Sequence, residues 1–205
     1  FNNGYFVHPL QDNSGYLLTS SIPANNTRYF RVLKIDLVGD TIWTKTHSKY
    51  KHVIYPGLSN YVNLNDTNFV FVGTIWLDTV TQTNDSSLAV LYKINAAGDV
   101  LLEKTFGDRG KKTFGHDVKA TADGGYIITG WTTGWGAATT TSRSFLLKVD
   151  SLGNEEWHQR YGTSRKDAYS VAVAPNGYLM SGSVYSAATD IDINWVKTDL
   201  LGNVI

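Results

Sequence analysis

Two stretches decide the fold: ADGGYIITG at residues 122–130, and LKVDSLGNEEW at residues 147–157. Each combines a turn rich in glycine and in acidic or amide residues with a run of apolar and β-branched residues. Val, Ile, Tyr and Thr alternate with small or polar residues in these runs, and no helical period is visible. The two stretches therefore predict short β-strands joined by tight turns.

Both stretches recur along the chain at intervals of about fifty residues. Counterparts of the first stretch lie at 15–20, 68–73 and 176–182, and counterparts of the second lie at 34–43, 93–99 and 197–203. Four copies at a regular spacing are typical of a propeller or a solenoid array. A residue that occurs once per copy is therefore assigned a structural role before a catalytic one.

The turns within the repeat have a mechanical explanation. In Asp-x-x-Gly, the carboxylate accepts hydrogen bonds from backbone amides two residues on, and glycine takes the positive φ that closes the hairpin. Four residues after this glycine stands Trp43 or Trp157, or Leu102 in the second copy, so we expect a large apolar side chain packed between neighbouring copies. The positions assigned to the structural repeat are Asp36, Gly39, Trp43, Asp123, Gly125, Asp150, Gly153, Trp157, Asp199 and Gly202.

Each copy predicts four antiparallel strands, which together form one propeller blade. We predict an all-β fold, a β-propeller of four-stranded blades that cover approximately 1–48, 49–106, 107–161 and 162–205. The last strand begins at Val204 and stops inside the motif, so we expect this segment to belong to a larger propeller or a longer protein. A closed ring of four blades is the less usual alternative. The expected strands are 4–8, 16–20, 29–35, 41–46, 61–64, 69–73, 89–94, 100–106, 117–120, 126–130, 145–149, 156–161, 169–173, 178–182 and 194–198.

The composition argues against several classes of partner. Eighteen basic and 18 acidic residues give the 205-residue chain zero formal net charge, so no electrostatic footprint for nucleic acid is present. The absence of cysteine excludes disulfides, thiolate metal sites and a cysteine nucleophile. No apolar run is long enough to span a bilayer, so we expect no direct membrane insertion.

Catalytic and metal-binding motifs are weak. The five histidines show no spacing typical of a metal site, and no nucleotide-binding or serine-hydrolase motif occurs. His116 and Asp117 are adjacent in a predicted strand and point to opposite faces, which favours a structural role for the histidine. We predict no catalytic residue, no bound metal and no cofactor, although calcium binding by a turn such as Asp123-Gly124 stays an open alternative.

Loop lengths point to one end of the scaffold as the binding surface. The loops between the second and third strands (20–28, 74–87, 131–144 and 184–192) and the connections between copies are long and differ in each copy. Variable loops on a rigid scaffold often carry function, and aromatic and arginine side chains are favoured at recognition surfaces. For Trp76 and Trp131 we prefer packing on their own loops, which leaves Trp135 as the best single contact candidate. The candidate residues are Trp76, Trp131, Trp135, Arg143, Tyr185, Arg109 and Arg165.

The repeat resembles that of the β-propeller proteins secreted by Bacteroidota, whose blades follow the pattern DGGY-I-x-G, K-x-D-x-x-G-x-x-x-W and Y-G. The third copy carries DGGY at 123–126, KVD at 148–150, Gly153, Trp157 and YG at 161–162. The fourth copy matches through 176–178, 197–199 and Gly202, whereas Asn95 and Leu102 depart from the pattern. Coverage is essentially the whole chain, and the motif is specific for the blade rather than for a biochemical role.

This resemblance implies export to the cell surface or the medium, often through the type IX secretion system, with secretion-system proteins as partners and an outer-membrane association. It also implies O-glycosylation at Asp-Ser/Thr-apolar motifs, of which Asp78-Thr79-Val80 lies in a long loop. Our first hypothesis is a non-catalytic, exported propeller that presents variable loops to a protein or a glycan.

Two alternatives remain open. The blade is also similar to the tryptophan-docked repeats of quinoprotein dehydrogenases, which implies an enzyme with a quinone and calcium at the centre of a larger propeller; another propeller enzyme, such as a hydrolase, belongs to the same alternative. The third hypothesis is a structural spacer within a surface adhesin. A quinone or metal in the purified protein would favour the enzyme.

Overall fold

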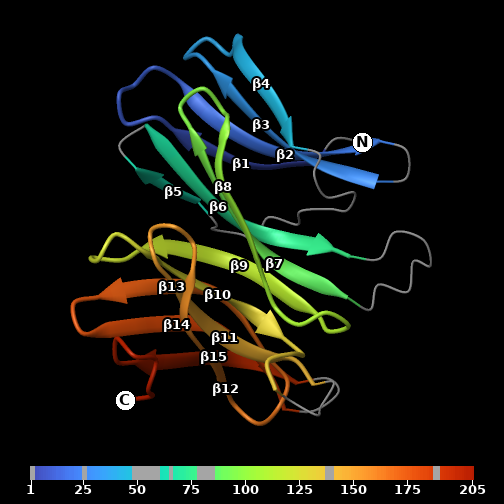
Figure 1. Cartoon of the computed structure of the whole chain (residues 1–205), viewed down its shortest axis with the longest axis vertical. Helices are drawn as coiled ribbons and strands as arrows, with labels where there is room; N and C mark the ends of the chain where they lie inside the picture. The colour runs from blue at the N-terminus through green and yellow to red at the C-terminus, as the bar shows by residue number, and fades with distance from the viewer. Residues whose placement is uncertain are drawn as a thin grey trace.

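The computed structural model describes residues 3–24, 27–47, 61–64, 67–77, 86–136, 141–186 and 190–205. Within these ranges the fold is all-β with no helix, and the strands form four antiparallel sheets (Figure 1). The all-β, antiparallel fold predicted from the repeat is thereby confirmed. The predicted glycosylation motif at 78–80 and the predicted boundary between the first two copies, at 48/49, lie outside the described residues.

Each sheet contains strands that are consecutive in the chain, and each strand pairs with the next. The elements are, for sheet 1, β1 (Asn3–Pro9), β2 (Tyr16–Ala24), β3 (Thr27–Ile35) and β4 (Thr41–His47); for sheet 2, β5 (Tyr61–Leu64), β6 (Asn68–Trp76), β7 (Ser87–Asn95) and β8 (Val100–Phe106); for sheet 3, β9 (Thr113–Ala120), β10 (Tyr126–Thr132), β11 (Arg143–Val149) and β12 (Glu155–Tyr161); for sheet 4, β13 (Lys166–Ala174), β14 (Gly177–Tyr185) and β15 (Ile191–Thr198).

A partial fourth strand is present in sheet 4. Val204 forms an isolated antiparallel bridge with Thr198, and the Ile205 N–H donates to the Lys197 carbonyl at 3.0 Å. The prediction that a further strand starts at Val204 is therefore confirmed by this bridge. Two strands depart most from the predicted bounds, by four residues each. β2 ends at Ala24 instead of Ser20, and β9 begins at Thr113 instead of Asp117 because Thr113 and Phe114 pair with the end of β10.

The sheets bury their faces against one another in chain order, and sheets 1 and 4 lie at opposite ends of the molecule (Figure 1). We call the face that meets the following sheet the forward face, and the other the reverse face. In each of sheets 1 to 3, one apolar residue of the second strand and one of the third strand lie at the centre of the forward face and are fully buried. These pairs are Leu17 and Val32, Val70 and Leu91, and Ile127 and Leu146. They meet the reverse face of the following sheet, which in sheets 2 to 4 carries Phe69 and Tyr92, Tyr126 and Leu147, Tyr178 and Val196.

The large apolar residue of each fourth strand packs on the turn glycine of the next sheet. A Cβ atom built on Gly98 would lie 2.8 Å from Cζ3 of Trp43, and one on Gly202 would lie 2.8 Å from Cζ3 of Trp157. Leu102 covers Gly153 in the same way, at 2.9 Å. The predicted packing of this side chain between neighbouring copies is confirmed, and it explains why the next turn must have a residue without a side chain.

The turns before these strands are closed by side-chain acceptors. Oδ1 of Asp150 accepts the N–H groups of Leu152 at 2.9 Å and Asn154 at 2.8 Å. Asn95, which departs from the repeat, accepts the corresponding N–H groups of Ala97 and Asp99 through its own Oδ1. An amide oxygen can therefore replace the carboxylate, because the turn uses the acceptor rather than the charge.

Candidate functional site

Where the structure describes them, the long loops and the connections between sheets lie at one end of the molecule, which we call the loop end. The connection from β8 to β9 bonds to both neighbouring loops: the Ser87 N–H donates to the Lys111 carbonyl at 2.9 Å, and the Thr133 N–H donates to the Lys112 carbonyl at 2.8 Å. The next connection is held likewise, because the Lys166 N–H donates to the Ser142 carbonyl at 3.1 Å. The loop end is thus a hydrogen-bonded surface.

Rings from three sheets gather at the loop end in a row that we call the aromatic strip. At its centre, Phe114 and Trp131 are cross-strand partners of β9 and β10, with ring centroids 4.3 Å apart and planes at 14°. Trp76, at the end of β6, meets Phe114 edge-on at 5.3 Å. Gly130 permits the close approach of β9 and β10, since a Cβ there would lie 1.8 Å from the Phe114 carbonyl oxygen. The members are Trp76, Phe114, Trp131, His116, Tyr169 and Tyr185, all partly exposed.

The second half of the strip crosses from sheet 3 to sheet 4. His116 stacks on Tyr169 at 5.3 Å with an interplanar angle of 18°. Its Nδ1 lies 2.8 Å from the Ala168 carbonyl oxygen, so this nitrogen carries the proton and donates. Burial lowers the pKa of His116 and outweighs the opposite effect of the Ala168 carbonyl. The His116 ring is therefore neutral at pH 7 and forms part of the aromatic strip.

Two cations lie beside the strip. The Arg165 guanidinium stands over the Tyr185 ring at 4.0 Å, and the Lys112 ammonium is 6.0 Å from the Trp76 centroid. Between them runs a groove of about 420 Å³, whose lining includes Lys112, Trp131, Thr133, Ser142, Arg165 and Asp167. The groove therefore combines a flat apolar wall with hydroxyl, carboxylate and cationic groups, the mixture that recognises a ligand with apolar faces and polar edges.

The structure brings together some of the predicted residues and separates others. Trp76 and Trp131 share the strip, where both contact Phe114, and Tyr185 pairs with Arg165. Trp135 points elsewhere: it is partly buried between sheets 2 and 3, stacked on His158 at 4.5 Å and edge-on to Phe145 at 4.8 Å. Its role as a ligand contact stays a prediction.

The two remaining arginines also lie apart from the groove lining. Arg143 opens β11, and its guanidinium donates to the Gly162 carbonyl. Arg109 is exposed in the turn between β8 and β9. Phe114, Tyr169 and Lys112 are not among the residues predicted for the site, because the predicted strand begins only at Asp117 and because variable loops, rather than strand ends, are predicted to carry the site. The alternation of Phe114 and His116 around Gly115 was the available signal.

Asp117 connects sheet 3 to sheet 4 and does not form a catalytic pair with His116. Its carboxylate is fully buried and accepts hydrogen bonds from the Val171 N–H at 2.9 Å, the Ser170 hydroxyl at 3.0 Å and the Lys119 ammonium at 2.7 Å. Burial raises the pKa of Asp117 against the effect of these donors. None of these partners is His116, in agreement with the predicted division of the two residues between opposite faces.

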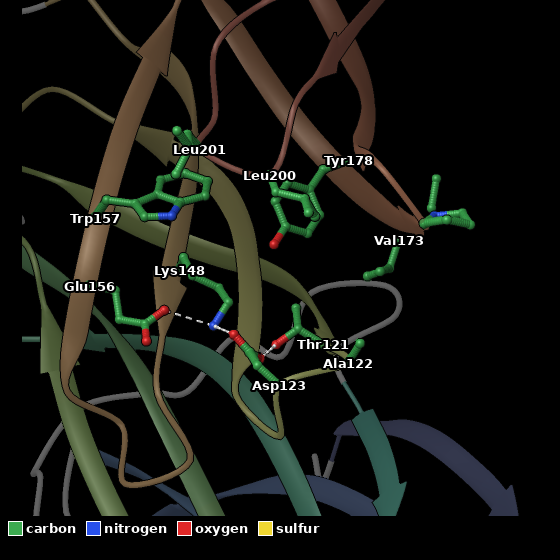
Figure 2. Close-up of a pocket in the computed structure, with 12 residues that line it drawn as sticks. Thr121, Ala122, Asp123, Lys148, Glu156, Trp157, Val173, Tyr178, Leu200 and Leu201 are labelled. Carbon is green, nitrogen blue, oxygen red and sulfur yellow. Dashed lines mark hydrogen bonds and ion pairs between the residues drawn. The ribbon is translucent and has the colours of Figure 1, made fainter.

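Another cavity lies at the opposite end, beside the short turns and away from the loops predicted to carry the site. Figure 2 shows this cavity of about 720 Å³, with Trp157 and Leu201 on one side and Tyr178 and Val173 on another. At its polar edge the Lys148 ammonium lies 2.8 Å from both the Asp123 and the Glu156 carboxylates (Figure 2). The repeated lysine of the third copy is thus held between two carboxylates at the wall of a largely apolar cavity.

The Asp123 carboxylate and the Lys148 ammonium remain ionised at neutral pH. Hydrogen bonds from Lys148, Thr121 and the Gly125 N–H hold the pKa of Asp123 well below its usual range. Burial alone would lower the pKa of Lys148, but its bonds to Asp123 and Glu156 outweigh burial and raise it. Asp123 therefore has a second function besides closing the hairpin: it neutralises a buried ammonium.

No group of three or more His, Asp or Glu side chains suited to a metal ion occurs among the described residues. The described part of the chain also contains no helix that could cross a membrane. Comparison with known proteins finds no family model that matches the chain and no curated protein similar to it.

Proposed function

We propose that the four sheets are consecutive blades of a β-propeller and that the protein binds a glycan through the aromatic strip without catalysing a reaction. The all-β repeat, the chain-order packing of the sheets and the tryptophan–glycine contacts between them support the blade assignment. Export to the cell surface, and passage through a type IX system, rest on the likeness of the repeat to exported Bacteroidota proteins.

One observation carries the proposed binding function: the stacked, partly exposed pair Phe114 and Trp131, edge-on to Trp76 and bordered by polar groups of the groove. Sugar rings offer apolar C–H faces and hydroxyl edges, which match flat aromatic walls and hydrogen-bonding borders. The strip is also pre-organised, since its rings are fixed by strands and by one another, so little side-chain entropy is lost on binding. A protein partner would use the same rings as anchors, and the binding experiment below distinguishes the two.

The test replaces Trp131, whose ring lines the groove but does not belong to the hydrophobic core between the sheets. In Trp131→Ala, we expect binding to an immobilised panel of neutral and acidic oligosaccharides to weaken about tenfold or more, because a central aromatic anchor is lost. Trp195→Ala is the matched control, because Trp195 is an exposed tryptophan of β15 outside the strip. Circular dichroism of both variants checks that the sheets persist.

Equal weakening by the two variants, or wild-type binding by Trp131→Ala, would contradict the assignment of the site. Binding to protein partners but to no glycan on the panel would move the proposal to a protein ligand. An absorption spectrum of the purified protein addresses the enzyme alternative, since a bound quinone absorbs outside the protein bands.

A further inference from the structure

Within the 205 residues, the forward face of sheet 4 is largely apolar and exposed. Its side chains include Ile193, Trp195 and Leu179, which are 79%, 66% and 44% exposed. Ile193 and Trp195 are neighbours on one face of β15, and Trp195 lies opposite Ser181 of β14. Exposed apolar patches of this kind on a soluble domain usually mark an interaction surface.

The repeat identifies what this face is built to meet. Aligning Tyr178 with Tyr126 and Lys197 with Lys148 places Leu179 at the position of Ile127, and Trp195 at the position of Leu146. Ile127 and Leu146 are fully buried, because the reverse face of sheet 4 covers them. The forward face of sheet 4 therefore has the residues of a sheet-packing surface and should accept the reverse face of another sheet of this repeat.

The chain itself carries a complementary face at its other end. On the reverse face of sheet 1, Tyr16, Leu18 and Leu33 are only half-buried, whereas their counterparts in sheet 3 are fully buried under sheet 2. The turn glycine of sheet 1 is open as well: nothing lies within 4 Å of a Cβ built on Gly39, although Gly98, Gly153 and Gly202 are all covered by the preceding sheet.

We propose that sheet 4 of one copy of this chain docks on sheet 1 of a second copy, continuing the sheet-to-sheet packing already present three times within the chain. Zero net charge favours such an association, because two copies do not repel each other through a net charge. The contact joins two different surfaces, so it is head-to-tail, and the rotation between copies decides whether a ring or a filament forms. This inference rests on the repeat and its buried faces and does not depend on the proposed glycan site.

The experiment uses a contact that the structure already shows. Between sheets 3 and 4, the Thr129 hydroxyl lies 3.6 Å from the Met180 sulfur. The repeat alignment places Ser181 at the position of Thr129 and Leu18 at that of Met180, so Ser181 of one copy should face Leu18 of the next. Since the chain has no cysteine, the variant Ser181→Cys with Leu18→Cys contains only the two test thiols.

We expect mild oxidation of this double variant to give disulfide-linked dimers and longer species on non-reducing gels. The matched control is Ser181→Cys with Leu152→Cys, in which the second thiol is placed at an exposed turn residue of sheet 3. Linked species in both variants, or in neither, would overturn the proposal. A disulfide within one chain would also overturn it, in favour of a ring closed by a single copy.

A second measurement needs no cross-link. Analytical ultracentrifugation of the 205-residue protein should show concentration-dependent association, and Trp195→Ser should raise the dimer Kd about tenfold or more, as expected for a central aromatic anchor. Because Trp195 is exposed, this variant should unfold at the wild-type temperature. A wild-type protein that stays monomeric at high concentration would overturn the proposal.

Discussion

At the residue scale, Lys148 shows how a repeated position acquires a local role. The lysine of the repeat is partly exposed at Lys34 and Lys93 and exposed at Lys197, but it is buried at Lys148. Only the third copy provides both carboxylates, Asp123 in the turn and Glu156 in β12. A buried ammonium without partners would be strongly destabilising, so the three charges act as a unit.

The contacts among Lys148, Asp123 and Glu156 predict how the free energy of unfolding depends on pH. The folded state lowers the pKa of Asp123, so the contribution of this carboxylate is complete above about pH 4 and is lost as the pH falls further. Because Asp123 is largely exposed, solvent screening limits the effect to about 1 kcal/mol or less. The variant Asp123→Asn should therefore lose less stability between pH 7 and pH 3 than the wild type.

Urea unfolding at the two pH values measures this difference. Glu156→Gln is the control, because it leaves the Asp123 bond to Lys148 intact and should keep most of the wild-type acid sensitivity. If Asp123→Asn and the wild type show the same change with pH, the carboxylate does not contribute as described.

At the scale of elements, the contact between a fourth strand and the next turn connects the sheets. Trp43 reaches across to sheet 2, where its indole N–H donates to the Ala96 carbonyl at 3.2 Å while its ring covers Gly98. Lys45 extends the same contact with an ion pair to Asp99 at 3.0 Å, but both partners are substantially exposed, so packing contributes more than this pair.

Two glycines make a matched test of that packing. Gly98 and Gly39 have φ values of +81° and +99°, so alanine at either position incurs a similar left-handed backbone cost. Only Gly98 lies under a tryptophan. Gly98→Ala should therefore lower the free energy of unfolding by about 1–3 kcal/mol more than Gly39→Ala, as measured in urea. Equal losses would mean that Trp43 moves aside without cost.

At the scale of the whole molecule, stability should follow the order of the sheets. Each sheet buries its faces mainly against its chain neighbours, and such arrays behave approximately as a sum of units and nearest-neighbour interfaces. The junction between sheets 3 and 4 is special because it includes the buried carboxylate of Asp117, which bonds to both Ser170 and Val171 of β13.

Asp117→Ala should loosen sheet 4 before the rest of the molecule. Losing this acceptor leaves the Val171 N–H without its partner and costs about 3 kcal/mol at that interface. Hydrogen exchange should then accelerate in β13 to β15 more than in β6 and β7. Asp192→Ala is the control, because Asp192 is an exposed carboxylate of sheet 4. Uniform acceleration across all sheets would contradict a stepwise array.

Much of the fold could be predicted because its signals are local. The alternating runs predict the strands, and the Asp-x-x-Gly turns predict their antiparallel order, since both depend on residues a few positions apart. The packing of Trp43, Leu102 and Trp157 was also predictable, because a large apolar side chain recurs at the same position of the repeat. The candidate site was predicted only in part: Trp76, Trp131, Tyr185 and Arg165 lie in or beside the strip, but Trp135 packs between sheets.

The sequence by itself determined the β-strands, the turns that join them and the repeat that orders the sheets, because each depends on backbone conformation and short-range hydrogen bonds. Only the tertiary structure decided which side chains meet. It placed Trp76 against Phe114 from another sheet, enclosed Lys148 between Asp123 and Glu156, and left Trp195 exposed where its counterpart Leu146 is buried. These outcomes depend on how one sheet lies on the next, and residues about fifty positions apart carry no local signal of that packing.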